Sequence, residues 1–432
     1  MNEIDRTQAP ATRPFGRLQL PQPAVEHLDN GIELYVIDKG DQEVCRIDLL
    51  FDGGRCPAPT PAIADLTGPM MRRGIPGYDA NRIAELLDYY GAWMQTGTTM
   101  HFSTLSVFSL NRNLSQVLPL VADIINKPLF PDDDLDLLRQ QRIDRLHINR
   151  SKVRFVAGEL FNQLVFGKNH PYARTIEADD ISAINRQDLQ EYHRKYYLGT
   201  RIRAIASGCI TKETANTVRQ FLCSIACHNM CHNLPAVPLQ PETEHFAAVD
   251  LPGTLQTGIR MGMPVAGCLH PDFPFLSMAN LILGGYFGSR LMKNIREEKG
   301  YTYGISSHII SLQNSAYFTI ITETGTDYTQ PLIEETRREM QTLCEKEVPA
   351  DELETARNYL QGQRARTLDS PFAMGDYYLS SMISNTPFDY FEREDEAIRH
   401  ATAADIQRAA QLYLRPEMLY VALAGDKATE SI

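Results

Sequence analysis

Arg296 and Tyr303 stand seven residues apart in the stretch Leu283–Ser307, and both side chains carry hydrogen-bond donors. A guanidinium and a phenol hydroxyl can stabilise negative charge that develops on a reacting oxygen, provided that the fold holds them in a cleft with little water. Taken alone, the same stretch also fits an ordinary connection between a helix and a strand in a core. The pair is therefore a candidate only together with its surroundings.

The residues around this pair predict the elements that position it. The Gly284–Gly285 pair permits a close backbone approach, and Ser289 stands at an N-cap position. Apolar residues then recur at helical spacing, and Gly300 is placed to end that helix. The next six residues alternate as in a strand. The pattern predicts a short helix with Arg296 near its end and a strand that carries Tyr303.

This stretch resembles the second-half signature of the pitrilysin/insulinase-type zinc peptidases, the inverzincins, which reads R-x-x-x-G-x-x-Y. Here the signature residues are Arg296, Gly300 and Tyr303, and the preceding L-G-G-x-x-x-S-R-L pattern runs from Leu283 to Leu291. The resemblance implies an α+β fold in which two duplicated αβ-roll halves form a clam-shell around a cleft. It covers essentially residues 25–427.

An internal repeat supports two similar halves. Residues 188–208 and 405–425 have the same pattern. Each is predicted to form a helix followed by a Tyr-Leu pair, a turn and a strand that ends in Gly. A Pro- and polar-rich segment lies between the repeats, as in a linker. We therefore expect an N-terminal arm (1–24), a first peptidase-like half with a degenerate zinc site (25–232), a linker (233–245) and a second half with the Arg and Tyr signature (246–432).

The zinc motif of the resembling family is missing from the first half. That motif reads H-x-x-E-H on one helix, where two His bind zinc and the Glu acts as general base. The equivalent positions here run from Asp65 to Pro69, with Gly68 in place of the Glu, and contain neither histidine. Pro69 lacks an N–H and should break or kink the helix. We predict no catalytic zinc and no cofactor in this chain.

The third family ligand is a Glu on a later helix. The corresponding window, Arg142–Asn149, contains no Glu. Asp144 or His147 could imitate one ligand, but one residue cannot hold a catalytic zinc. An exposed helix face with alternating Arg and Asp is the better interpretation of this window.

A chain that lacks the zinc motif but keeps Arg296 and Tyr303 resembles the second member of a heterodimeric inverzincin. The resemblance implies a homologous partner that carries H-x-x-E-H and zinc and hydrolyses short unstructured peptides. This chain would supply Arg296 and Tyr303 in trans and would be inactive alone. The alternatives are a catalytically inactive scaffold of the same fold and a protein that binds peptides in its own cleft without cutting them.

Composition narrows the possible partners and compartments. The 432-residue chain has a formal net charge of −12, which argues against nucleic acid, whose phosphates need a basic face. No apolar run approaches the roughly 20 residues of a membrane span. No secretory signal is visible, so a cytoplasmic location is expected, with a periplasmic one open if a signal was removed.

Three of the eight cysteines are clustered. Cys223, Cys227 and Cys231 are spaced by four, with His228 and His232 beside them. This spacing places the cysteines on one face of a helix. Zinc sites normally use tighter Cys pairs and ligands from more than one element, so the end of an amphipathic helix is the favoured interpretation over a metal site.

Overall fold

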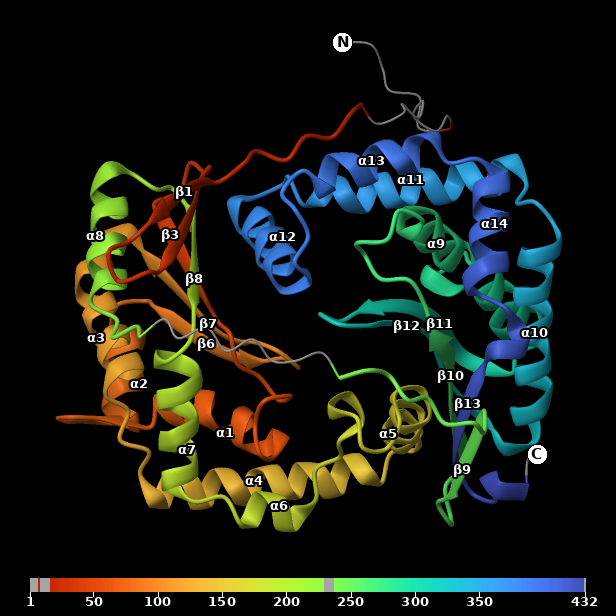
Figure 1. The fold of residues 1–432 in the computed structure, drawn as a ribbon, viewed down its shortest axis with the longest axis horizontal. Coiled ribbons are helices and arrows are strands. Elements are labelled where there is room, and N and C mark those ends of the chain that lie inside the picture. The colour runs from red at the N-terminus through yellow and green to blue at the C-terminus, as the bar shows by residue number, and fades with distance from the viewer. Residues whose placement is uncertain (1–6, 8–15, 229–236, 431–432) are drawn as a thin grey trace.

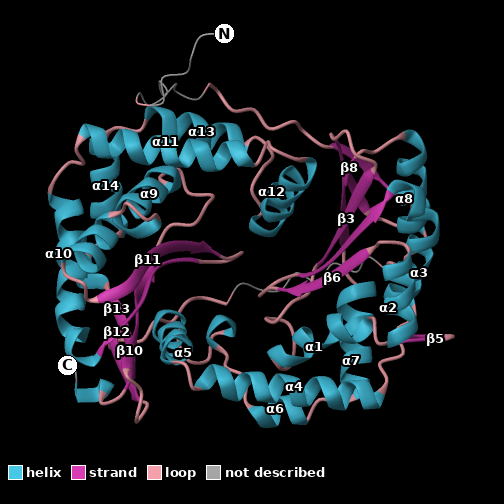
Figure 2. Ribbon diagram, turned by 180° about the vertical axis from the view of Figure 1, so that it is seen from behind, coloured by secondary structure: helices cyan, strands magenta, loops and turns pink. Residues whose placement is uncertain are grey.

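The computed structural model describes Thr7 and residues 16–228 and 237–430 (Figure 1). Most of the expected arm and the start of the expected linker therefore lie outside the described residues. The described chain is α+β, as predicted, with two large sheets and helices around them (Figure 2). No described helix is both long enough and apolar enough to cross a membrane.

The first sheet has six strands in the order β1-β2-β8-β3-β7-β6, and only the β2–β8 pair is parallel. Gly31, with φ +84°, completes the Asn30–Gly31 turn between β1 and β2. Strands β6 and β7 pair as an antiparallel hairpin. The strands are β1 (Ala24–His27), β2 (Glu33–Asp38), β3 (Val44–Phe51), β6 (Trp93–Thr98), β7 (Ser103–Leu110) and β8 (Ile202–Gly208).

Helices surround this sheet, and a small separate sheet of β4 (Gly74–Ile75) and β5 (Tyr78–Asp79) accompanies them. Two of these helices, α4 and α5, follow each other directly and are separated only by Ser151 and Lys152. The helices are α1 (Pro61–Met71), α2 (Ala80–Tyr89), α3 (Leu114–Asn126), α4 (Asp132–Arg150), α5 (Val153–Phe166), α6 (Ala178–Ser182), α7 (Arg186–His193) and α8 (Lys212–Cys223).

The second sheet repeats the plan of the first. Its order is β11-β12-β10-β13-β9, and only the β9–β13 pair is parallel, so it corresponds to β6-β7-β3-β8-β2. The strands are β9 (Phe246–Asp250), β10 (Gln256–Pro264), β11 (Thr302–Ser311), β12 (Ala316–Gly325) and β13 (Tyr420–Gly425). The helices are α9 (Phe273–Asn280), α10 (Thr329–Glu345), α11 (Ala350–Arg366), α12 (Pro371–Ser384), α13 (Tyr390–His400) and α14 (Ala403–Tyr413).

The sequence repeat has the same local structure in both copies. Helix α7 begins with a capping box of Asn185 and Asp188, and α14 begins with one of Thr402 and Asp405. Helix α7 leads to β8, which pairs in parallel with β2. Helix α14 leads in the same way to β13, which pairs in parallel with β9. The predicted duplication of the two halves is confirmed.

Each half contributes a helix to the sheet of the other half. Helix α5 packs on β10 and β13, whereas α12 packs on β8 and β2 (Figures 1 and 2). Buried Met374 and Tyr378 of α12 share an apolar cluster with Tyr35 and Ile205 of the first sheet. Between the halves lies a cleft of about 750 Å³, lined by Asn149 and residues 151–155 on one side and by residues 254–256 and Glu323 on the other. The halves are thus interlocked around a cleft.

Candidate functional site

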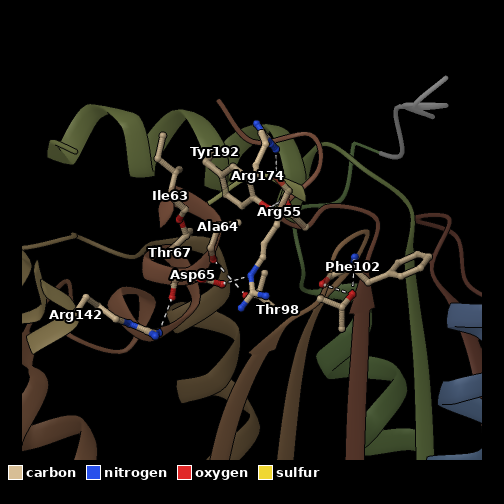
Figure 3. Close-up of polar contacts among 12 residues, drawn as sticks. Arg55, Ile63, Ala64, Asp65, Thr67, Thr98, Phe102, Arg142, Arg174 and Tyr192 are labelled. Carbon is tan, nitrogen blue, oxygen red and sulfur yellow. Dashed lines mark hydrogen bonds and ion pairs between the residues drawn. The ribbon is translucent and has the colours of Figure 1, made fainter. Parts of the chain in front are cut away.

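Helix α1 carries the positions equivalent to the zinc motif, and it remains helical to Met71. Pro69, which was expected to break or kink the helix, therefore does not break it. A residue other than proline at position 69 would donate its N–H to the carbonyl of Asp65. Arg142 of α4 approaches that carbonyl instead, with Nη2 3.4 Å from the oxygen (Figure 3). A contact from a distant helix thus compensates for the missing donor.

Two further side chains support the carbonyls of α1. The hydroxyl of Thr98, at the end of β6, donates to the Ala64 carbonyl at 3.2 Å, and that of Thr67 donates to Ile63 at 2.7 Å (Figure 3). The helix is buried along most of its length. Its backbone is therefore held by packing and by neighbouring side chains, even though it contains both Gly68 and Pro69.

The side chains at the motif positions do not fit a zinc ion. The Asp65 carboxylate binds Arg55, with 2.9 Å between Nε and Oδ1 (Figure 3). A Cβ at Gly68 would lie only 3.1 Å from Thr96 Cβ and from the Tyr197 hydroxyl, so there is little room for the Glu of the motif. Within residues 16–228 and 237–430, no group of three His, Cys, Asp or Glu side chains is arranged to hold a metal.

Neither candidate for a third ligand faces α1. Asp144 and His147 are both exposed on α4, and Asp144 accepts a hydrogen bond from Gln140 at 2.8 Å. The predicted exposed face is present at Asp144 and His147, whereas Arg142 of the same helix is half-buried and approaches α1. The separation arises because residues three apart share a face of a helix and their immediate neighbours do not.

Arg296 lies near the end of the predicted short helix, in a π-helical segment, Met292–Glu298. The Lys299 N–H bonds to the Asn294 carbonyl at 3.0 Å, an i to i+5 bond that widens the turn. Gly300, with φ +66°, ends the segment as predicted. Ser289 does not cap it, since its buried hydroxyl has no hydrogen-bond partner among the described residues.

Tyr303 lies on β11 at an irregularity of the sheet, where the pairing with β12 shifts between Thr302 and Ile305. The hydroxyl of Thr302 accepts from the Gly304 N–H at 3.1 Å and donates to the Glu323 carbonyl at 2.6 Å. Thr322 donates to the Gly304 carbonyl at 3.0 Å. Such a bulge redirects a side chain, and here Tyr303 is 91% exposed.

The structure brings Arg296 and Tyr303 together. The Arg296 guanidinium carbon lies 5.7 Å from the centre of the Tyr303 ring and 4.8 Å from that of Phe287. Both distances suit cation–π contact. Arg296 forms no ion pair or hydrogen bond with another described residue, whereas Arg290 is bound to Glu352 through two hydrogen bonds of 2.9 and 2.7 Å. Arg290 is thus structural, and the donors of Arg296 remain available.

A cavity of about 270 Å³ lies beside α1. Sequence reasoning missed it because its basic residues come from three separate segments. They are Arg55 before α1, Arg142 and Arg145 on α4, and Arg174 before α6, with Asp65 and Glu159 as the acidic members of the lining. The only signal in the sequence was the pair of arginines at helical spacing on α4.

The cysteine cluster does not form the predicted helix face. Helix α8 ends at Cys223, and Cys227 lies in the following turn with its sulfur 3.5 Å from the Thr200 carbonyl. Cys231 and His232 lie outside the described residues. No disulfide joins two described cysteines, and burial raises the pKa of the Cys56 and Cys344 thiols to about 11. Those two thiols are therefore protonated at neutral pH.

Comparisons with known proteins agree with this architecture. A family model described as the Peptidase M16 inactive domain matches residues 183–360. An uncharacterized zinc protease of Bacillus subtilis is 22% identical over 303 residues, which are 70% of this chain and 73% of that protein. The crystal structure of a peptidase M16 inactive domain from Pseudomonas fluorescens superposes with a TM-score of 0.87 at 22% identity, covering 94% of this chain and 98% of that one.

Two relatives from Bos taurus are named as subunits. The mitochondrial-processing peptidase subunit beta is 21% identical over 331 residues, covering 75% of this chain and 66% of that protein. Subunit 1 of the cytochrome b-c1 complex is 21% identical over 290 residues, covering 62% and 56%. Together with the duplicated fold, these similarities show that residues 183–360 match the Peptidase M16 inactive domain and that the chain is homologous to M16 zinc proteases and subunits, although its sequence lacks the H-x-x-E-H motif.

Proposed function

We propose that this chain is the non-zinc-binding subunit of a heterodimeric M16 metallopeptidase. The observation that carries this proposal is the contact between Arg296 and the 91% exposed Tyr303, in a chain whose zinc-motif positions on α1 hold no set of metal ligands. Arg296 has no partner for its donors within the described chain, and Tyr303 presents nearly its whole side chain to solvent. A residue pair kept only for packing would be buried.

The geometry suits the stabilisation of a developing oxyanion. Two donors, a phenol hydroxyl and a guanidinium, project from a β-bulge and a π-helical segment that are fixed by hydrogen bonds. Donors that are oriented before the reaction need no reorganisation when charge develops, and they act most strongly where water is excluded. The zinc and the activated water would belong to a homologous partner with H-x-x-E-H, whose chamber Arg296 and Tyr303 would enter in trans.

The substrate in this proposal is a short, unstructured peptide bound in extended form in the partner. The similarity to the mitochondrial-processing peptidase subunit beta, a named subunit, supports a paired assembly. We expect the assembly in the cytoplasm. The periplasm is the alternative, since the periplasmic protease PqqL of Escherichia coli shares the fold, with a TM-score of 0.77 at 14% identity over 49% of its chain.

The experiment is affinity purification of this chain from its native cells, followed by mass spectrometry and a peptidase assay. We expect a similar-sized chain with H-x-x-E-H to be recovered at one-to-one, and peptidase activity only in the pair. Recovery of this chain alone, or of a pair with no activity, would contradict the proposal.

A catalytically inactive scaffold is the second candidate, and the similarity to subunit 1 of the cytochrome b-c1 complex favours it. A scaffold would be recovered constitutively within a larger assembly, and its Arg296 and Tyr303 would be dispensable. The same purification therefore distinguishes the two candidates.

A further inference from the structure

The cavity beside α1 carries an excess of positive charge. Four arginines line it, against the two carboxylates of Asp65 and Glu159. It lies next to α1, the helix that carries the positions equivalent to the zinc motif. The first half therefore contains a basic cavity beside this helix.

Arg142 and Arg145 are the two arginines with free donors. They stand three residues apart on α4 and therefore share one face of the helix. Arg142 makes only the 3.4 Å contact with the Asp65 carbonyl, and Arg145 forms no hydrogen bond or ion pair with any described residue. Arg145 is exposed, so the cavity opens to solvent on its side. The planar guanidinium group is suited to binding a carboxylate through two parallel hydrogen bonds.

The other two arginines add charge and rigidity. Arg174 donates to the backbone carbonyls of Arg55 at 2.6 Å, Cys56 at 3.0 Å and Ala58 at 3.1 Å. Carbonyl oxygens accept its hydrogen bonds without neutralising its charge. Arg55 is paired with Asp65. The positive charge of Arg174 thus stays uncompensated at the wall of the cavity.

The rest of the lining is largely apolar and includes Leu66, Phe155 and Ile181. Its volume of about 270 Å³ is below the roughly 300–1,000 Å³ of pockets that enclose a whole small ligand. A site of this size suits the end of a longer molecule that has both an apolar group and an anionic group.

We propose that this cavity binds a carboxylate of a short peptide, held by Arg142 and Arg145, with an adjoining apolar side chain against Leu66 and Phe155. The site belongs to this chain alone, and it does not depend on a zinc-bearing partner. The carboxylate can come from the C-terminus or from an acidic side chain, and the two sources share the same recognition chemistry.

A peptide carboxylate suits the site better than a phosphate group. Asp65 and Glu159 both lie in the lining, and two carboxylates repel a dianion more than a monoanion. Glu159 is half-buried and has no hydrogen-bond partner among the described residues. Burial is the main cause that raises its pKa, and the nearby Glu177 adds to this effect while Arg150 opposes it. Glu159 therefore weakens anion binding without preventing it.

The test is isothermal titration calorimetry of the full chain with three acetylated alanine-rich tetrapeptides. One ends in leucine with a free carboxylate, one is its C-terminal amide, and one is an amide with an internal aspartate. We expect the free acid to bind and the plain amide to bind at least about tenfold more weakly, because a charge-assisted pair is lost. Comparable binding by the aspartate peptide would support the proposal and would identify a side chain as the source.

Three single variants, and inorganic phosphate as a competing ligand, complete the experiment. Arg145→Gln should weaken binding of the free acid at least about tenfold, because an exposed guanidinium partner is removed. Glu159→Gln should tighten it several-fold, because a repelling charge is removed, and a folding defect cannot cause that change. Arg194→Gln is the matched control, since Arg194 is exposed and lies outside the cavity lining. It removes the same charge and should leave the affinity unchanged.

Equal binding of the free acid and the plain amide would overturn the proposal, as would unchanged affinity in both Arg145→Gln and Glu159→Gln. The proposal would also be overturned if inorganic phosphate bound to the chain and none of the three peptides did. Binding of the free-acid peptide or of the aspartate peptide supports the carboxylate site whether or not a partner subunit exists. The carboxylate-site proposal can therefore fail while the heterodimer proposal stands, and the reverse is also true.

Discussion

The Asp65 carboxylate accepts a hydrogen bond from Arg55 Nε at 2.9 Å. Asp65 stands at the position of the first zinc ligand in the resembling motif, and its side chain is engaged by a cation. A carboxylate paired in this way is not available to a metal without displacement of the arginine. The departure from the metallopeptidase motif therefore extends beyond the motif residues to the neighbours that now bind them.

Tyr303→Phe tests the role of the hydroxyl in the proposed pair. The ring stays over Arg296, so the cation–π contact and the bulge should be preserved. Loss of one oxyanion donor typically lowers kcat about 100-fold or more. We expect a fall of at least about tenfold in kcat of the reconstituted heterodimer, measured by cleavage of a fluorogenic peptide, with assembly unchanged by gel filtration.

Tyr89→Phe is the control for this experiment, because Tyr89 is 81% exposed on α2 and lies far along the chain from the signature. It should leave kcat unchanged. A Tyr303→Phe pair as fast as its parent would show that the hydroxyl takes no part in catalysis.

Restoring the zinc motif by Asp65→His, Gly68→Glu and Pro69→His should not restore a metal site. A side chain at position 68 would crowd Thr96 and Tyr197, and overpacking of this kind costs about 1–3 kcal/mol. Arg55 and Arg142 would also remain beside the metal position. We expect less than one zinc ion per ten chains by mass spectrometry of the dialysed variant. Stoichiometric zinc would mean that the surroundings adapt.

The pH dependence of stability should reflect two buried histidines. Burial lowers the pKa of His101 and of His193 from 6.5 to about 4. The unfolded chain then binds more protons than the folded chain between these values, so stability is complete above pH 6.5 and falls as pH drops towards 4. Each group can contribute up to about 3 kcal/mol to this loss.

Urea unfolding at pH 7.5 and pH 5.0 measures this effect. The double variant His101→Gln and His193→Gln should show a clearly smaller difference between the two pH values. His147→Gln, which changes an exposed histidine, should retain the parent difference. If the double variant keeps the full pH dependence, other groups cause it.

Met374→Ala tests whether the exchanged helix α12 joins the halves. Met374 is fully buried against the first sheet, in the cluster that contains Tyr35 and Ile205. Truncating a buried methionine costs about 2–5 kcal/mol. We expect that loss, in one cooperative urea transition, because α12 belongs to the second half but covers the first. Leu412→Ala, at a residue 53% exposed, should change the free energy of unfolding by less than about 1 kcal/mol.

The sequence alone determined the features that depend on local patterns. The Asn30–Gly31 turn, the helix end at Gly300 and the two repeated helix-to-strand units follow from backbone preferences and hydrophobic period. The Arg296 and Tyr303 signature was likewise readable, because its residues are close in the chain. The expected domain boundaries and the catalytic role of this pair remain predictions.

Only the tertiary structure decided what distant residues do together. Helix α1 continues through Pro69 to Met71, and Arg142, 77 residues after Asp65, approaches the carbonyl that has lost its helical donor. The basic cavity likewise combines residues from Arg55 to Arg174, and the exchange of α5 and α12 joins elements from opposite halves. Such contacts depend on how helices and strands pack against one another in the folded chain. Neither local backbone preferences nor the hydrophobic period of a single segment determines that packing.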